Sequence, residues 1–153
     1  MSKLREIIRY FCQNYPNKNE LSKARLTKMV YLADWKAAKR FKKQLTNIKW
    51  FFNYYGPYVD DVFREANTDP YLDIQIQKTM FGDTKTIIMP KQKIDIFNLT
   101  PEEQNILDEV INETKTLYWD QFINLVYSTT PVRMQDKFSS LDLVKYATIK
   151  DKS

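Results

Sequence analysis

The first apolar positions of the chain recur three and four residues apart, which is the spacing of one face of an α-helix. They follow Ser2, a residue type that favours the position just before a helix, and the pattern stops before Pro16. The pattern predicts an amphipathic helix from about residue 3 to residue 14. Its apolar face consists of Leu4, Ile7, Ile8, Phe11, Cys12 and Tyr15.

A second helix is predicted from about residue 22 to residue 40, and its pattern differs from that of the first. Residues 29 to 33 are apolar on almost every side of this helix, whereas both of its ends are polar. Such a pattern is typical of a helix that its neighbours bury on all sides. We therefore expect this helix to lie at the centre of the core.

Between residues 50 and 90 the apolar positions change to the period of a strand. Trp50, Phe52 and Tyr54 occupy alternate positions, which predicts a short strand. Residues 72 to 77 and 84 to 89 carry two further strand patterns, with Gly82 between them, and predict an antiparallel hairpin. The strand at Trp50 is a candidate third member of this small sheet.

The remaining apolar patterns are helical. A short helix is expected near residues 59 to 66, and Thr100-Pro101-Glu102-Glu103 is a capping box that predicts the start of another. A helix from Trp119 is expected to end near Pro131, and a weaker one lies near residues 141 to 146. We predict an α+β fold, mainly α: a single domain over residues 1–153, with five to six helices around the central helix and a small antiparallel sheet.

Gly56 is one of only two glycines in the 153 residues, and Pro57 follows it directly. Glycine adopts a positive φ without strain and proline fixes its own φ, so the pair predicts a rigid corner. On these residues alone, the plainer interpretation is a strand-to-helix turn packed by the neighbouring tyrosines.

Two segments together resemble a known family. Residues 28–34, Lys-Met-Val-Tyr-Leu-Ala-Asp, are similar to the Lys-Leu-Leu-Tyr-Leu-Ala-Asp helix that opens the Panacea domain, the SocA-like antitoxin domain of bacterial and phage toxin–antitoxin pairs. Residues 55–57 match the Tyr-Gly-Pro turn of that family. The helix that opens at Leu99 and residues 125–131 also look like family features, so the resemblance covers nearly the whole chain. One departure is that relatives often carry a histidine before the late proline, whereas this chain has none.

The resemblance implies an antitoxin that neutralises a cognate toxin by direct protein–protein binding, without an enzymatic step and without a cofactor. An adaptor that delivers a toxin to a cytosolic protease is an alternative that the resemblance also allows. We expect the partner-binding surface to be formed by one face of the central helix, by its basic end and by the Gly-Pro corner. The residues are Asp34, Trp35, Lys39, Arg40, Lys43, Tyr55, Gly56, Pro57 and Tyr58.

Asp34 interrupts an otherwise apolar helix, which leaves two interpretations open. It either faces a partner or takes part in a buried hydrogen-bond network, and we favour a structural pairing with a tyrosine of the Gly-Pro corner.

Charge is distributed unevenly along the chain. Residues 1 to 50 hold 13 lysines and arginines against 3 acids, whereas the rest of the chain is net acidic. The densest basic cluster, residues 36–43, ends the central helix, where cations are also favoured by the helix dipole. It is either a solvated helix end, a contact for an acidic patch on a partner, or the phosphate-binding surface of a nucleic-acid-binding regulator.

Composition excludes most catalytic and cofactor classes. With no histidine, one cysteine and two glycines, the chain lacks the residues for a Ser-His-Asp or Cys-His pair, a zinc cluster, or a glycine-rich phosphate loop. A carboxylate-metal nuclease is a weaker alternative, since Asp83 is better explained by the hairpin turn; its candidates are Asp60, Asp61, Asp69 and Asp73, with Asp83 and Lys85. We expect no metal, no enzymatic activity, no membrane insertion and a cytoplasmic location.

Overall fold

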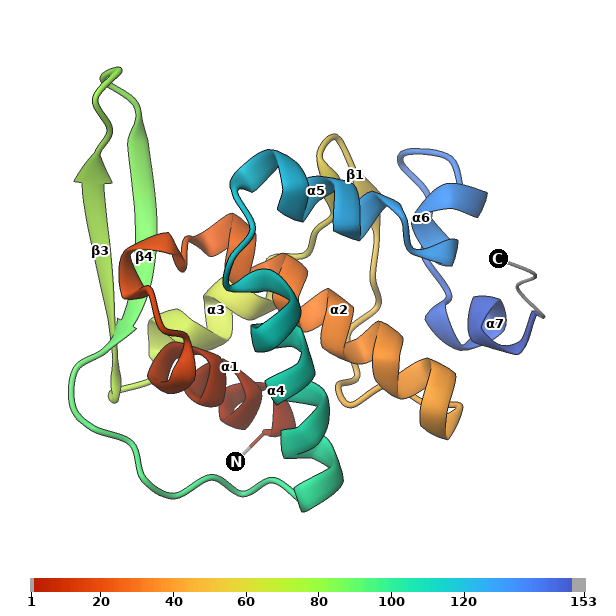
Figure 1. The fold of residues 1–153 in the computed structure, drawn as a ribbon, viewed down its shortest axis with the longest axis horizontal. Helices are drawn as coiled ribbons and strands as arrows, with labels where there is room; N and C mark the ends of the chain where they lie inside the picture. Colours follow the sequence, from red (N-terminus) through yellow and green to blue (C-terminus); the bar gives the residue numbers. More distant parts are fainter. Residues whose placement is uncertain (1, 150–153) are drawn as a thin grey trace.

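The fold is that of a computed structural model, which describes residues 2–149. Its centre is helix α2 (Lys23–Phe41), which crosses the molecule diagonally in Figure 1 and is buried along most of its length. Ser22 caps its start by accepting a hydrogen bond from the amide of Arg25, and Lys42 ends it with a left-handed φ of 57°. The predicted central helix is confirmed.

Three helices pack against α2 on one side of the molecule: α1 (Lys3–Asn14), α3 (Asp61–Thr68) and α4 (Pro101–Thr114). Helix α7 (Leu143–Thr148) packs against the other end of α2. The bounds of α1 agree with its periodicity, and the predicted capping box of α4 is present, because the side chains of Thr100 and Glu103 each accept a hydrogen bond from the other's amide. The apolar faces of these helices form one core with α2.

The hairpin consists of β3 (Leu72–Lys78) and β4 (Thr84–Pro90), paired antiparallel with Lys78 opposite Thr84. Its outer end projects from the body of the molecule (Figure 1). Gly82 takes a positive φ of 84° in the turn, as the predicted hairpin requires.

The expectation of a third hairpin strand at Trp50 is wrong. Residues 52 and 53 form β1 (Phe52–Asn53), which pairs with β2 (Gly56–Pro57) across the corner. The neighbouring backbone is taken by residues 138–141 instead: Leu141 donates to the carbonyl of Trp50, and Phe52 donates to the carbonyl of Ser139.

The sequence predicts one helix from Trp119 to near Pro131, but two helices occupy this region. Helix α5 (Trp119–Tyr127) ends first, and α6 (Thr130–Met134) begins with Pro131 in its first turn, where no backbone N–H is needed. Residues 2–149 therefore contain seven α-helices, together with the short 3₁₀ helix η1 (Lys18–Glu20). The fold class, α+β and mainly α, is confirmed. No helix in this range is both long and apolar enough to span a membrane.

Candidate functional site

Asp34 is fully buried, with 0% of its surface exposed. Its carboxylate accepts hydrogen bonds from the amides of Leu45 and Thr46 at 2.9 and 3.0 Å, from the Thr46 hydroxyl, and from the indole N–H of Trp50 at 2.9 Å. The structural pairing is therefore present, but the tyrosine partner expected for it is wrong. The donors come from residues 44–50, which return along α2 after the helix ends.

The pKa of Asp34 reflects two opposing influences. Burial raises the pKa to about 6, and the hydrogen bonds from Thr46 and Trp50 act in the opposite direction. Because Asp34 is not exposed, it cannot contact a partner directly in this structure. It can affect an interface only by positioning residues 44–50 through its hydrogen bonds.

The Gly-Pro corner is tightly packed from inside. Gly56 has a φ of 99°, and a Cβ at this position would lie 3.0 Å from Cε1 of the Tyr127 ring. Gly56 and Pro57 are buried, whereas Tyr55 is 79% exposed and Tyr58 is half-buried. The corner thus requires glycine both for its conformation and for its lack of a side chain, and it presents Tyr55 to the solvent.

Lys28 lies behind this corner, with only 2% of its surface exposed. Its Cε lies 3.8 Å from the position of a Cβ on Gly56. Burial lowers the pKa of Lys28 to about 8, and no charge among the described residues offsets this effect. A charged ammonium is therefore held in a poorly solvated position beside the corner.

The basic end of α2 is partly neutralised by acids of α4. Arg40 forms two hydrogen bonds to the carboxylate of Glu109, and Lys36 pairs with Glu113 at 2.7 Å. Trp35 is buried, and the ammonium of Lys39 lies 5.2 Å from its ring centroid.

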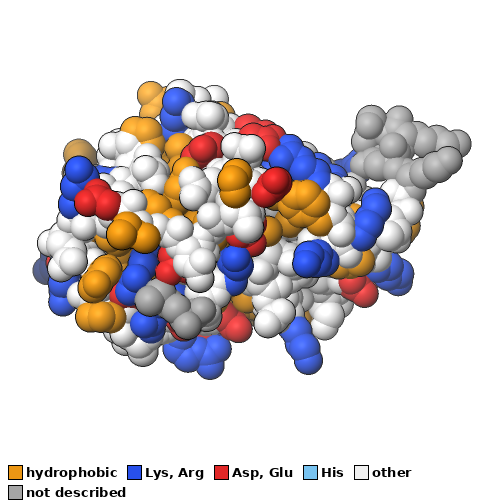
Figure 2. All heavy atoms as spheres, turned by 90° about the horizontal axis from the view of Figure 1, so that it is seen from below, with side chains coloured by type: hydrophobic (Ala, Val, Ile, Leu, Met, Phe, Trp, Pro, Cys, Tyr) orange, Lys and Arg blue, Asp and Glu red, His pale blue; other side chains and the backbone are white. Residues whose placement is uncertain are grey.

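Lys39, Arg40 and Lys43 are exposed, as a contact surface requires. On the face of the molecule in Figure 2, however, lysines and arginines are interspersed with acidic and apolar side chains rather than gathered into one stripe.

One of the acids considered for a metal site is held in an ion pair. Asp69 is buried and accepts two hydrogen bonds, of 2.6 and 2.7 Å, from the guanidinium of Arg9. Burial raises the pKa of Asp69, but its interactions with Arg9 and a backbone amide outweigh this and leave the pKa lowered. Across residues 2–149, no three His, Cys, Asp or Glu side chains are grouped to hold a metal ion.

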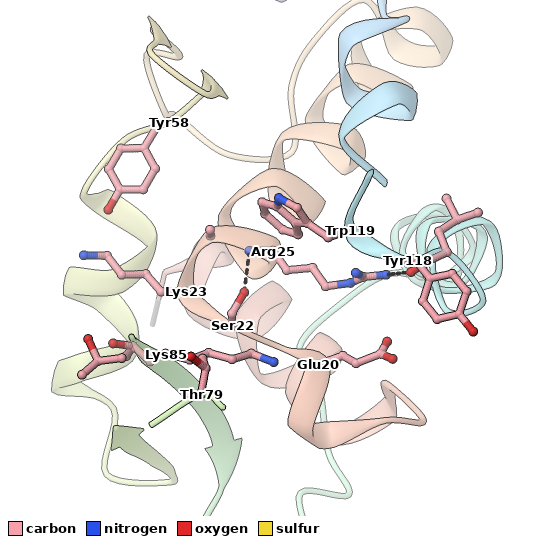
Figure 3. Close-up of a pocket in the computed structure, with 13 residues that line it drawn as sticks. Glu20, Ser22, Lys23, Arg25, Tyr58, Thr79, Lys85, Tyr118 and Trp119 are labelled. Carbon is pink, nitrogen blue, oxygen red and sulfur yellow. Dashed lines mark hydrogen bonds between the residues drawn. The ribbon is translucent and has the colours of Figure 1, made fainter. Parts of the chain in front are cut away.

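A groove of about 690 Å³ opens between the hairpin, the start of α2 and the connection from α4 to α5. We call it the α2 groove, and Figure 3 shows the side chains around it. Charged and aromatic side chains make up much of its lining, among them Glu20, Lys23, Tyr58, Lys85, Tyr118 and Trp119. Tyr58 is the one predicted partner-binding residue in this lining.

Positive charge dominates the α2 groove. Lys23 lies at the first position of α2, with its ammonium 4.5 Å from the ring centroid of Phe63, and Lys85 donates to the carbonyl of Asn19. Arg25 lies deeper, and its guanidinium donates to the carbonyls of Thr114 and Leu117. Glu20 is the one acid in the lining. The start of a long helix adds its own partial positive charge, so the groove favours an acidic ligand.

The sequence interpretation missed Lys23, Tyr118 and Trp119 as site residues, and it considered Lys85 only for a carboxylate-metal site. Lys23 and Lys85 are brought to one groove only because β4 packs against the segment before α2. Tyr118 and Trp119 are 80% and 43% exposed, although Trp119 lies in an apolar pattern that predicts a buried helix face. Nothing local to these residues indicates that they meet.

Comparison with known protein families identifies the family of this chain. Residues 26–131 match the family model described as antitoxin SocA-like, Panacea domain. The chain belongs to the SocA-like antitoxin family. Neither a search of curated proteins nor a search of solved structures found a match. The matched range contains both segments on which the resemblance rested, so the recognition of a Panacea domain is confirmed.

Within this SocA-like chain, the matched range covers the Gly-Pro corner, the hairpin and the aromatic wall of the α2 groove, whereas Lys23 and Arg25 precede it. Membership of the family indicates an antitoxin role and a protein toxin as the general kind of partner.

Proposed function

We propose that this chain neutralises a cognate toxin by binding it directly, with no catalytic step of its own. The observation that carries this proposal is the match of residues 26–131 to the SocA-like antitoxin family. The α2 groove supports it physically, since an open, positively charged groove with partly exposed aromatic side chains suits recognition of a protein surface.

We place the toxin-facing surface at the α2 groove and the adjoining Gly-Pro corner. Tyr58 lines the groove, and Tyr55, three residues earlier in the chain, is 79% exposed, so both can contact a partner. Gly56 and Pro57 are buried and serve by fixing the position of these tyrosines. Asp34 and Trp35 are interior residues and act through the packing of α2.

The test is to express the protein encoded beside this chain in its genome, with and without the chain, and to measure growth and co-purification. Toxicity that the chain relieves, together with a stable complex, would support the proposal. A neighbour that is not toxic, or rescue without a complex, would contradict it. Toxin abundance measured in the same cells separates inhibition, in which it is maintained, from delivery to a protease, in which it falls.

Two variants test whether the α2 groove contacts the toxin. Tyr58→Ala removes an aromatic side chain from the groove and should weaken binding by about 10-fold or more. Ile96→Ala is the matched control, because Ile96 is 87% exposed and lies in the connection before α4, outside the groove lining. Equal affinity of both variants and the unchanged chain would remove Tyr58 from the interface.

A further inference from the structure

The outer edge of β4 carries main-chain groups that point away from the hairpin. The amide of Ile88 donates to the carbonyl of Leu21 at 3.2 Å, and the carbonyl of Ile88 lies 3.7 Å from the thiol of Cys12. Alternate residues of an antiparallel strand point their polar groups to the same side. The main-chain N–H and C=O groups of Thr86 and Thr84 therefore also point away from β3, and both residues line the α2 groove.

The chain covers this edge only in part. Ser22 forms an antiparallel bridge with Ile87, and α2 then begins at Lys23 and leads away from the strand. From outside the hairpin, no group within residues 2–149 hydrogen-bonds the amide of Thr84 or Thr86. An uncovered strand edge is a template on which another chain can add a strand.

The charge around this open edge is unusual for the start of a helix. Acids are favoured in the first turn, where the helix dipole is positive, yet the first turn of α2 contains no acid and begins with Lys23. Lys85 lies on β4 itself, between the two threonines, and its ammonium is beside the start of α2 (Figure 3). Positive potential is thus concentrated where the strand edge opens, which selects for an acidic side chain in whatever binds there.

Apolar side chains surround the same region. Trp119 and Tyr118 line the groove with 43% and 80% of their surfaces exposed. The turn end of the hairpin exposes Met80 and Phe81 by 97% and 90%. Exposed apolar side chains in such number mark an interaction surface.

From these three observations we infer that an extended segment of the toxin adds to β4 at residues 84–86 as an antiparallel or parallel strand. An acidic side chain of this segment contacts Lys23 and Lys85, and a neighbouring apolar side chain packs on Trp119. The inference rests on the proposed function, because the toxin is the partner that supplies the strand.

Amide hydrogen exchange provides a direct readout. In the complex with the neighbour-encoded protein, we expect the amides of Thr84 and Thr86 to exchange at least about 10-fold more slowly than in the free chain, because they become hydrogen-bonded. The amides of Ile76 and Lys78 provide the internal control, since these residues lie opposite Thr86 and Thr84 on β3 and point to the other edge of the hairpin. Their exchange should stay unchanged.

Proline substitutions test the same edge by affinity. Thr86→Pro removes an N–H that points into the groove, and Ile76→Pro removes the corresponding N–H on the outer edge of β3, so each spares the hydrogen bonds within the hairpin. We expect Thr86→Pro to weaken toxin binding about 100-fold, and Ile76→Pro less than about 3-fold. Circular dichroism checks that both variants fold. If Thr86→Pro does not fold, amide hydrogen exchange of Thr84 and Thr86 in the unsubstituted chain tests the inference instead.

Charge reversal tests the acidic contact separately. Lys23→Glu with Lys85→Glu should weaken binding at least about 10-fold and reduce its salt dependence, whereas Lys91→Glu with Lys93→Glu, at exposed positions outside the groove, should have little effect. Equal effects of the two pairs would overturn the acidic contact.

The outcomes separate the inference from the proposed function. If the chain neutralises and binds the toxin while Thr86→Pro binds as tightly and the two threonine amides stay unprotected, the inference is overturned and the proposed function stands. If the chain neither neutralises nor binds the neighbour-encoded protein, the proposed function fails and the inference fails with it. A dimer of this chain that Thr86→Pro dissociates, with toxin binding unaltered, would assign the edge to a second copy and overturn the inference.

Discussion

Gly56 is constrained by two independent requirements at the scale of a single residue. Its φ of 99° is strained for any side-chain-bearing residue, and a Cβ would meet the ring of Tyr127 at 3.0 Å. Gly82 has the first constraint without the second, because its φ is 84° and no atom lies within 4 Å of the position of a Cβ. The two glycines therefore separate the cost of conformation from the cost of packing.

We expect Gly56→Ala to lower the free energy of unfolding by about 2–4 kcal/mol, because backbone strain and overpacking add. Gly82→Ala should cost about 1–2 kcal/mol through backbone strain alone. Urea denaturation followed by circular dichroism measures both. Equal losses of unfolding free energy in the two variants would mean that the Tyr127 ring moves aside without destabilising the fold. Gly56→Val, with a larger side chain, should be more destabilising still.

Lys28 makes stability depend on pH in a defined direction. Its pKa falls from the ordinary 10.5 to about 8 in the folded chain. Between these values the unfolded chain binds more protons than the folded chain, so the free energy of unfolding rises with pH across this window. Below about pH 8 the ammonium is charged in both states, and its burial lowers stability.

Lys28→Met should therefore raise the free energy of unfolding at neutral pH by about 1–2 kcal/mol, because it removes the buried charge and keeps the length of the side chain. The advantage over the unchanged chain should shrink as the pH rises from about 8 toward 10. Urea denaturation at several pH values measures it, and Lys91→Met, at an exposed position, is the control. A gain that is constant with pH would show that the charge is not its cause.

At the scale of elements, Asp34 joins α2 to the segment that follows it. One carboxylate oxygen accepts the amides of Leu45 and Thr46, and the other accepts the Trp50 indole and the Thr46 hydroxyl. Trp50 in turn accepts a hydrogen bond at its carbonyl from Leu141, so this one acid also helps to position the chain before α7.

Asp34→Asn should lower the free energy of unfolding by about 2–4 kcal/mol, since either orientation of the amide places its NH₂ group against N–H donors and leaves them unpaired. Urea denaturation provides the value, and the indole N–H resonance of Trp50 should shift as its hydrogen bond is lost. Asp95→Asn, at an exposed acid, is the matched control and should cost less than about 0.5 kcal/mol. Similar losses for the two variants would contradict the role of Asp34.

At the scale of the whole molecule, segments outside the family match contribute to the same core. Helix α1 precedes the matched range and α7 follows it, yet both pack against α2. Buried side chains from both helices, such as Ile7 and Leu143, belong to the core cluster that contains α2. We therefore propose that residues 1–153 behave as one folding unit.

We expect thermal or urea unfolding to be a single cooperative transition. Tryptophan fluorescence reports on Trp35, Trp50 and Trp119, whereas far-ultraviolet circular dichroism reports on all helices, and the two curves should coincide. Separate melting of the carboxyl-terminal helices or of the hairpin, seen as curves that do not coincide, would contradict a single unit.

The predictions that succeeded are those that depend on neighbours in the sequence. The bounds of α1, the capping box of α4 and the turn at Gly82 each follow from side chains within a few residues of one another. Those that failed depend on distant partners: the backbone near Trp50 pairs with residues 138–141 rather than with the hairpin. The choice between two possible strand partners depends on which surfaces become buried together, and the local sequence pattern carries no information on this.

The candidate site divides in the same way. The sequence by itself determined the family, the central helix and the rigid corner at Gly56, because these reside in short contiguous motifs and in local conformational preference. Only the tertiary structure decided that Asp34 points inward, that Arg40 pairs with Glu109, and that Lys23, Lys85 and Trp119 share a groove. These contacts join residues far apart along the chain, and packing of whole elements around α2 brings them together.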